Sequence, residues 1–108
     1  NVAYLGRGMV FNKFTGARGK SGSSDASAEY LGELRRMMDE NGVSYQLAEL
    51  GRVDLGGGGT IAYIMARYGM DVIDNGVAVM SMHAPWEVTS KVDIYEMKKG
   101  YDVFLRNA

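Results

Sequence analysis

The sequence predicts an α/β fold in which a layered sheet carries flanking helices. Short apolar or alternating segments occur in turn with amphipathic segments whose apolar residues recur every three or four positions. Glycine-rich or Asn-Gly stretches, which are typical of turns, separate these segments. With 46% hydrophobic and 23% charged residues, the 108-residue chain has the composition of one globular domain. We therefore treat residues 1–108 as a single domain piece.

Strands and helices are expected to alternate along the chain. The expected strands are residues 8–14, 43–49, 71–73 and 76–82. The expected helices begin at Ser24 or Asp25, at Thr60, and at Thr89 or Ser90. Residues 15–24, which are polar and rich in glycine, are expected to form a loop, and Asp74-Asn75-Gly76 has the composition of a turn. The first helix should end at Asn41-Gly42 and the second at Gly69, because glycine readily adopts the left-handed conformation there.

The aspartates are explained first by local structure rather than by catalysis. Caps and turns account for Asp25, Asp54, Asp74 and Asp93. Asp93 lies three residues beyond Ser90, which is a weak version of the capping box. The final helix carries apolar residues on two faces, so we expect it to be covered on more than one side.

Charge, cysteine content and hydropathy exclude several classes of protein. The 12 Lys and Arg residues balance 13 Asp and Glu residues, so nothing in the composition favours nucleic acid or an anionic membrane as a partner. The absence of cysteine excludes disulfide scaffolds, thiolate nucleophiles and iron–sulfur clusters, so any metal must be held by nitrogen and oxygen. No apolar run reaches about 18 residues and no signal peptide is visible. We expect a cytoplasmic location, and the start at Asn1 indicates a piece of a longer protein.

His83 is the single histidine of the chain. It follows an apolar strand and is expected at the carboxyl end of that strand, where open α/β sheets bind ligands. It is either a hydrogen-bonded structural residue or a metal ligand or acid–base group. One histidine cannot complete a zinc site, which needs three or four protein ligands. Nearby Glu87 either supports His83 as a carboxylate partner or is a solvated turn residue.

A run of four glycines, residues 56–59, precedes Thr60. Either its bare backbone N–H groups cradle an anion, or it allows close approach of the backbone to a strand or a substrate. The run lacks the Gly-Lys-Ser/Thr ending of a phosphate-binding loop, so nucleotide binding is not favoured.

Longer motifs are more specific than these patterns. Residues 51–62, 68–87 and 90–95 resemble the C-terminal part of the aspartyl aminopeptidase and aminopeptidase I family of metallopeptidases. The most specific feature is Gly-Gly-Gly-Thr at 57–60, followed a little over twenty residues later by Ser-Met-His at 81–83. The resemblance covers essentially the whole chain.

This resemblance implies a fragment of a larger zinc-peptidase catalytic domain. Family members are cytoplasmic exopeptidases that use two divalent metal ions, usually zinc, to remove single N-terminal residues from peptides, and they assemble into homo-oligomeric dodecamers. Their other metal ligands and their general base lie upstream. No catalytic residue is therefore expected within this segment, which should be inactive alone.

The resemblance also implies roles for particular residues. His83 would ligate one metal ion, and Lys13 falls near the basic residue that contacts substrate in relatives. The substrate would lie beside Gly57, Gly58, Gly59 and Thr60. A tyrosine expected before the Ser24-Asp25 pair is absent, so substrate preference does not transfer. The alternative is a non-catalytic α/β module for interaction or oligomerisation.

Overall fold

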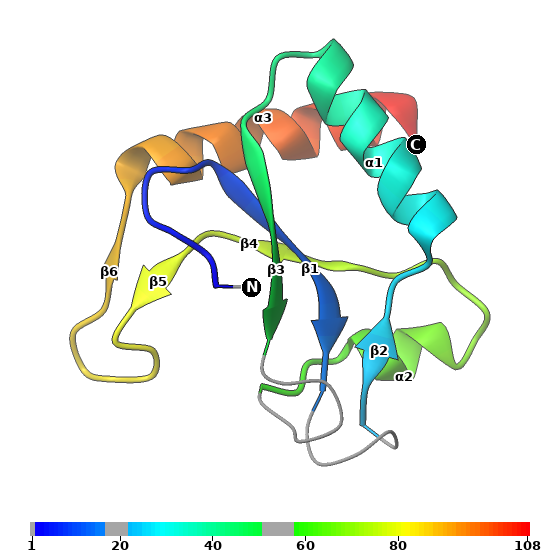
Figure 1. The fold of residues 1–108 in the computed structure, drawn as a ribbon, viewed down its shortest axis with the longest axis horizontal. Helices are drawn as coiled ribbons and strands as arrows, with labels where there is room; N and C mark the ends of the chain where they lie inside the picture. The colour runs from blue at the N-terminus through cyan, green and yellow to red at the C-terminus, as the bar shows by residue number, and fades with distance from the viewer. Residues whose placement is uncertain (1, 17–21, 51–57) are drawn as a thin grey trace.

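The computed structural model describes residues 2–16, 22–50 and 58–108, and it confirms the α/β class (Figure 1). Strand β1 (Met9–Thr15) lies in the middle of a four-stranded sheet. It pairs in parallel with β3 (Tyr45–Leu50) and antiparallel with both β2 (Ser24–Asp25) and β4 (Asp74–Gly76). A separate two-stranded sheet joins β5 (Val79–Met80) to β6 (Val88–Thr89).

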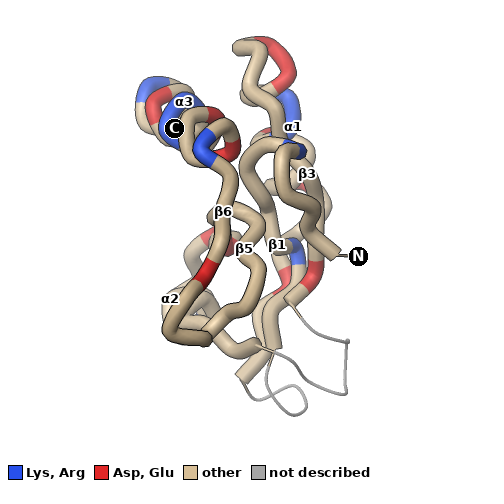
Figure 2. Tube along the Cα trace, turned by 90° about the vertical axis from the view of Figure 1, so that its left-hand side faces the viewer, with Lys and Arg blue, Asp and Glu red and all other residues tan. Residues whose placement is uncertain are grey.

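Helices lie at both ends of this sheet. Helix α1 (Ala28–Glu40) connects β2 to β3, and α3 (Lys91–Asn107) follows β6. Both lie toward the amino ends of β1 and β3, whereas the short α2 (Ala62–Ala66) lies toward their carboxyl ends (Figure 1). Both signs of charge are interspersed along α1 and α3 (Figure 2). No helix in the described ranges is long and apolar enough to cross a membrane.

The core uses both faces of β1, because successive side chains of a strand point to opposite sides. Met9 and Phe11 pack with Leu34 and Met38 of α1, and α3 contributes partly buried residues to the same cluster. Val10 faces the other way and packs with buried Ala48 and Ala78. The central strand is therefore covered on both sides, as expected for an apolar segment that does not alternate in polarity.

Helix α1 begins later than the sequence predicts. Ser24 and Asp25 pair with Thr15 and Phe14 of β1, so their backbone is extended and neither residue caps the helix. The cap is Ser27, whose Oγ accepts a hydrogen bond from the backbone N–H of Tyr30 at 3.2 Å. The predicted end at Asn41-Gly42 is confirmed: Asn41 is the C-cap, and Gly42 has φ = +65°.

The region of residues 69–82 departs most from prediction. Residues 74–76 form β4 rather than a turn, because they pair with β1 over Val10–Asn12 and Asn75 Nδ2 donates to Val10 O at 3.0 Å. Residues 71–73 form no strand. Within 76–82, Gly76 ends β4, and Val79–Met80 forms a separate short strand that pairs outside the main sheet. Pairing with the buried central strand has overridden local turn preference. The second helix is shorter than expected, and Gly69 follows its end with φ = +76°.

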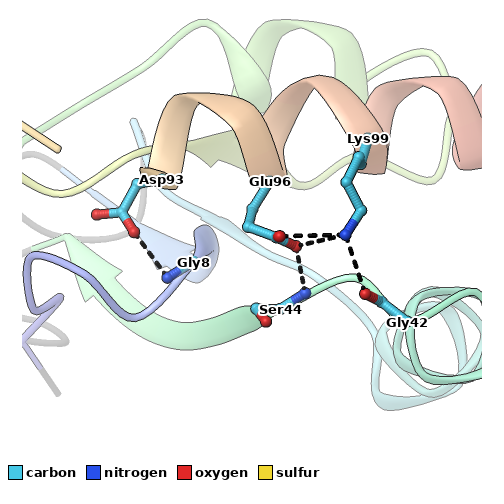
Figure 3. Close-up of polar contacts among 6 residues, drawn as sticks. All are labelled: Gly8, Gly42, Ser44, Asp93, Glu96 and Lys99. Carbon is cyan, nitrogen blue, oxygen red and sulfur yellow. Dashed lines mark hydrogen bonds and ion pairs between the residues drawn. The ribbon is translucent and has the colours of Figure 1, made fainter. Parts of the chain in front are cut away.

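Helix α3 begins after Ser90 as predicted, but Asp93 has a different role from the one expected. Ser90 makes no side-chain capping hydrogen bond. Asp93 is fully buried, and its carboxylate accepts hydrogen bonds from the backbone N–H groups of Gly6 and Gly8, each at 2.8 Å (Figure 3 draws the bond to Gly8). A Cβ on Gly8 would lie 2.2 Å from the carbonyl oxygen of Ser44, so this close approach requires glycine.

The next two turns of α3 bind the backbone of the residues that lead into β3 (Figure 3). Glu96 Oε2 accepts from the backbone N–H of Ser44 at 2.8 Å, and Lys99 Nζ donates to the carbonyl of Gly42 at 3.2 Å and to Glu96. Of the apolar residues of α3, Met97, Val103 and Phe104 pack against the core. The expected cover on a further side is not provided by the described residues, which leave exposed the side chains of Val92, Ile94, Tyr95, Tyr101 and Leu105.

The contacts of Glu96 predict a pH dependence of stability. The backbone N–H of Ser44, and then the ammonium of Lys99, lower the pKa of Glu96 below its ordinary value of 4.5. A carboxylate whose pKa is lowered by folding stabilises the folded state fully above its unfolded pKa, and this contribution is lost as pH falls through the folded pKa. We expect the difference in free energy of unfolding between wild type and Glu96→Gln to be constant near neutral pH and to shrink below pH 4.5.

Denaturant unfolding of the full-length protein at several pH values measures this difference. Glu40→Gln is the matched control, because Glu40 is exposed and contacts only Arg36 on its own helix among the described residues. A Glu96→Gln difference that is independent of pH between 3 and 7 would contradict the assignment.

Candidate functional site

The candidate site is built at the carboxyl ends of β1 and β3, where open α/β sheets bind ligands. The described end of the glycine run reaches this edge. The carbonyl of Gly58 accepts a hydrogen bond from the backbone N–H of Gly16, the residue after β1, at 3.1 Å. A Cβ on Gly58 would lie 2.5 Å from Leu50 Cδ2, so Gly58 itself lies close to the side chain of a β3 residue. Gly58 and Gly59 are exposed, and Gly57 lies outside the described residues.

Thr60 joins this segment to the sheet through its hydroxyl. Thr60 Oγ1 donates to Asp74 Oδ2 at 2.8 Å and accepts from the backbone N–H of Ala62 at 3.1 Å. Thr15 Oγ1 lies 3.3 Å from Thr60 Oγ1, and Thr15 is 2% exposed. Sequence reasoning did not find Thr15, and it assigned Asp74 to a turn. The signal that could have identified Thr15 is a threonine hydroxyl at the carboxyl end of an apolar strand, where ligands bind.

Lys13 lies near the same edge, but its ammonium is engaged by a carboxylate. Lys13 Nζ forms an ion pair with Asp25 Oδ1 of β2, and both side chains are exposed. The register of β1 and β3 shifts between Asn12 and Phe14, so Lys13 occupies an irregularity in the strand. An exposed ion pair contributes little stability. A role for Lys13 in substrate binding stays a prediction.

His83 lies in the exposed loop that connects β5 to β6. The base of this hairpin is held by the two strand pairs and by Thr89 Oγ1, which donates to the carbonyl of Ala78 at 2.9 Å. Ala78 is buried in the core, so the hairpin projects from a fixed point. In Figure 1 the loop lies on the same side of the molecule as the carboxyl ends of β1 and β3.

His83 can offer one nitrogen donor to a metal ion, and a complete zinc site needs further donors. Within the described residues, the His83 side chain makes no hydrogen bond. Neutral imidazole nitrogen is a common zinc donor. No group of three or more His, Cys, Asp or Glu residues that could hold a metal occurs among the residues described. Glu87 is exposed and makes no hydrogen bond to His83 in the described structure, so the solvated reading of Glu87 is favoured.

A cavity borders this site and shares Asp74 and Ala62 with it. Its volume is about 380 Å³, and it lies among the three helices and the sheet, with an apolar lining that includes Met9, Phe11 and Phe104. Its lining contains Asp74 but neither His83 nor the glycine segment. At the sheet edge, the sequence-predicted residues Gly58 and Thr60 come together with Thr15 and Asp74, whereas no hydrogen bond joins His83 to them among the described residues.

An open α/β sheet whose edge carries a glycine segment, with an imidazole in the exposed loop of a neighbouring two-stranded sheet, is compatible with a ligand-binding or metal-assisted catalytic domain. A sequence model of the aminopeptidase I zinc metalloprotease family (M18) matches residues 1–105. The chain belongs to this family, which confirms the resemblance.

Comparison with relatives shows how much of a full-length family member this chain covers. The chain is 65% identical over 107 residues to a probable M18 family aminopeptidase 1 of Clostridium acetobutylicum and 48% identical over 101 residues to that of Thermotoga maritima. These matches cover 99% and 94% of this chain but only 23% and 22% of the relatives. The chain therefore spans about a quarter of the length of the curated relatives that it matches.

Solved structures agree with the fold. The crystal structure of aminopeptidase I from Clostridium acetobutylicum matches with a TM-score of 0.89 at 65% identity, over 99% of this chain and 24% of that one. The M18 aminopeptidase from Thermotoga maritima matches with a TM-score of 0.88 at 47% identity, over 97% and 23%. A more distant protein, PhTET1-12s, whose structure is a dodecamer, shares the fold at 19% identity with a TM-score of 0.73.

Proposed function

We propose that this chain is part of a zinc aminopeptidase that hydrolyses single N-terminal residues from peptides. The observation that carries the proposal is family membership over residues 1–105, together with an exposed, unpartnered His83 imidazole within the described structure. His83 would donate one imidazole nitrogen to a metal ion. The described residues supply no complete metal site, which supports further ligands from the rest of the protein.

The proposed metal content is two divalent ions, with zinc supported by the family description. When bound, such ions polarise the scissile carbonyl and lower the pKa of a water molecule. In this chain, His83 of the β5–β6 loop would donate an imidazole nitrogen to one metal ion, and the exposed Gly58–Gly59 backbone would lie beside the substrate. We place Lys13 and Thr60 near the substrate on the resemblance alone.

The assembly and location are proposed from the family resemblance. A homo-oligomer, with the family dodecamer as its form, would cover apolar side chains that the described structure leaves exposed on α3. PhTET1-12s, which shares the fold and whose structure is a dodecamer, supports the proposal of a homo-oligomer. We propose a cytoplasmic location, with peptides as the substrates and neither nucleic acid nor membrane as a partner.

Metal removal from the full-length protein tests the proposed activity. Dialysis against a chelator should abolish release of the N-terminal residue from short peptides, and added zinc should restore it, because the reaction requires the Lewis acid. Metal content and free amino acid are measured in parallel. Full-length protein that releases no amino acid at any zinc concentration, or that keeps full activity after its metal is removed, would favour the alternative of a non-catalytic interaction module.

A further inference from the structure

We infer that Thr60, Thr15 and Asp74 form a hydrogen-bonded unit that positions the Gly58–Gly59 backbone, and that the Thr60 hydroxyl does not contact substrate. The inference rests on the proposed function for its kinetic consequences. The hydrogen-bonded unit itself is argued only from contacts among the described residues.

A count of hydrogen bonds at Thr60 leads to this inference. A threonine hydroxyl offers one proton and two lone pairs. The proton is directed to Asp74 Oδ2, since a carboxylate only accepts, and one lone pair accepts from the backbone N–H of Ala62. Thr15 Oγ1 lies 3.3 Å away, and it must be the donor, because the only proton of Thr60 is already used. Donor and acceptor capacity at Thr60 are both filled.

These bonds join three parts of the fold. Thr15 is the buried last residue of β1, Asp74 is the first residue of β4, and the bond to Ala62 fixes the first turn of α2. On the other side of the segment, the bond from Gly16 N–H to Gly58 O ties the backbone to the end of β1. Gly58 and Gly59 are therefore held between two anchors.

The chemistry of such a segment indicates what it would recognise. Glycine offers only backbone N–H and C=O groups, which match the main chain common to all peptides rather than any one side chain. We therefore assign Thr60, Thr15 and Asp74 as positioning residues for binding of the peptide main chain. Their loss should affect substrates with different N-terminal residues by the same factor.

Variants of the full-length enzyme test this assignment. Thr60→Val keeps the shape of the side chain but removes the hydroxyl, and we expect kcat/KM to fall by about 10- to 100-fold, as for a small displacement of a positioning group. Thr60→Ser keeps the hydroxyl and should stay close to wild type. Asp74→Ala should resemble Thr60→Val, and the double variant should be no worse than either single variant, because both remove the same interaction.

A structural readout separates this role from a general loss of stability. Hydrogen exchange of the Gly16 amide should be faster in Thr60→Val but not in Thr60→Ser, since Gly16 N–H bonds to Gly58 O. Ser27→Ala is the matched control, because it removes another bonded hydroxyl, at the start of α1, far along the chain from the glycine segment. It should leave kcat/KM and Gly16 exchange unchanged.

The outcomes are distinguishable. Wild-type kcat/KM and wild-type Gly16 exchange in both Thr60→Val and Asp74→Ala would overturn the inference. A kcat/KM loss in Thr60→Ser equal to that in Thr60→Val, or a loss that depends on the N-terminal residue, would also overturn it. Absence of peptide hydrolysis in the wild-type protein would instead overturn the proposed function, and Gly16 exchange would still test the hydrogen-bonded unit.

Discussion

Replacing His83 by alanine in the full-length protein should remove a bound metal ion and lower kcat/KM for peptide hydrolysis by about a hundredfold or more. The physical reason is that His83 is the single histidine of this chain, and its exposed imidazole has no competing hydrogen bond within the described structure. Loss of residues that only support metal ligands already costs about 10- to 100-fold in affinity or activity, so loss of a ligand should cost at least as much.

Metal analysis and steady-state kinetics on the same preparations measure this effect. Glu87→Gln is the matched control, because Glu87 lies in the same exposed loop and makes no hydrogen bond to His83 in the described structure. It should retain both metal and activity. Full metal content and unchanged turnover in His83→Ala would contradict the assignment of His83 as a ligand, even if the protein is a peptidase.

Asp93→Ala should be among the most destabilising single substitutions in this chain. The Asp93 carboxylate is fully buried and accepts two backbone hydrogen bonds, from Gly6 and Gly8. A hydrogen bond to a charged group contributes roughly 1.5–3 kcal/mol, and a buried donor left unsatisfied costs a similar amount. We expect the free energy of unfolding to fall by about 3 kcal/mol or more. Asp93→Asn should be intermediate, because its single carbonyl oxygen can replace only one of the two acceptors.

Denaturant unfolding of the full-length protein tests this prediction. Asp102→Ala is a matched control on the same helix, since the Asp102 side chain is 57% exposed and pairs with Arg106 one turn away. An exposed pair of this kind contributes about 0.3–0.5 kcal/mol. Equal losses of stability in Asp93→Ala and Asp102→Ala would show that the buried carboxylate does not hold the turn before β1.

Much of the fold followed from local patterns. The β1 segment, the stop of α1 at Asn41-Gly42 and the start of α3 after Ser90 were all predicted, because apolar periodicity and glycine conformations act over a few residues. The family was also recognisable, since the Gly-Gly-Gly-Thr and Ser-Met-His motifs occur together in this chain and the family model matches residues 1–105.

Two of the errors share one cause, which is pairing with a distant strand. Ser24-Asp25 has the composition of a helix cap and Asp74-Asn75-Gly76 that of a turn, yet both segments pair with β1. Backbone groups beside a buried strand must find hydrogen-bond partners, and this requirement outweighs the local preference of polar residues for caps and turns.

For the candidate site, the sequence by itself determined the chemistry that is available: a single imidazole, no thiol, and a glycine run that ends in a threonine. Only the tertiary structure decided which groups meet. It directed the Asp93 carboxylate to the turn before β1 and brought Thr15, Thr60 and Asp74 into one hydrogen-bonded unit. The reason is physical: a side chain's type is local information, whereas its hydrogen-bond partner depends on segments that only packing of the sheet brings together.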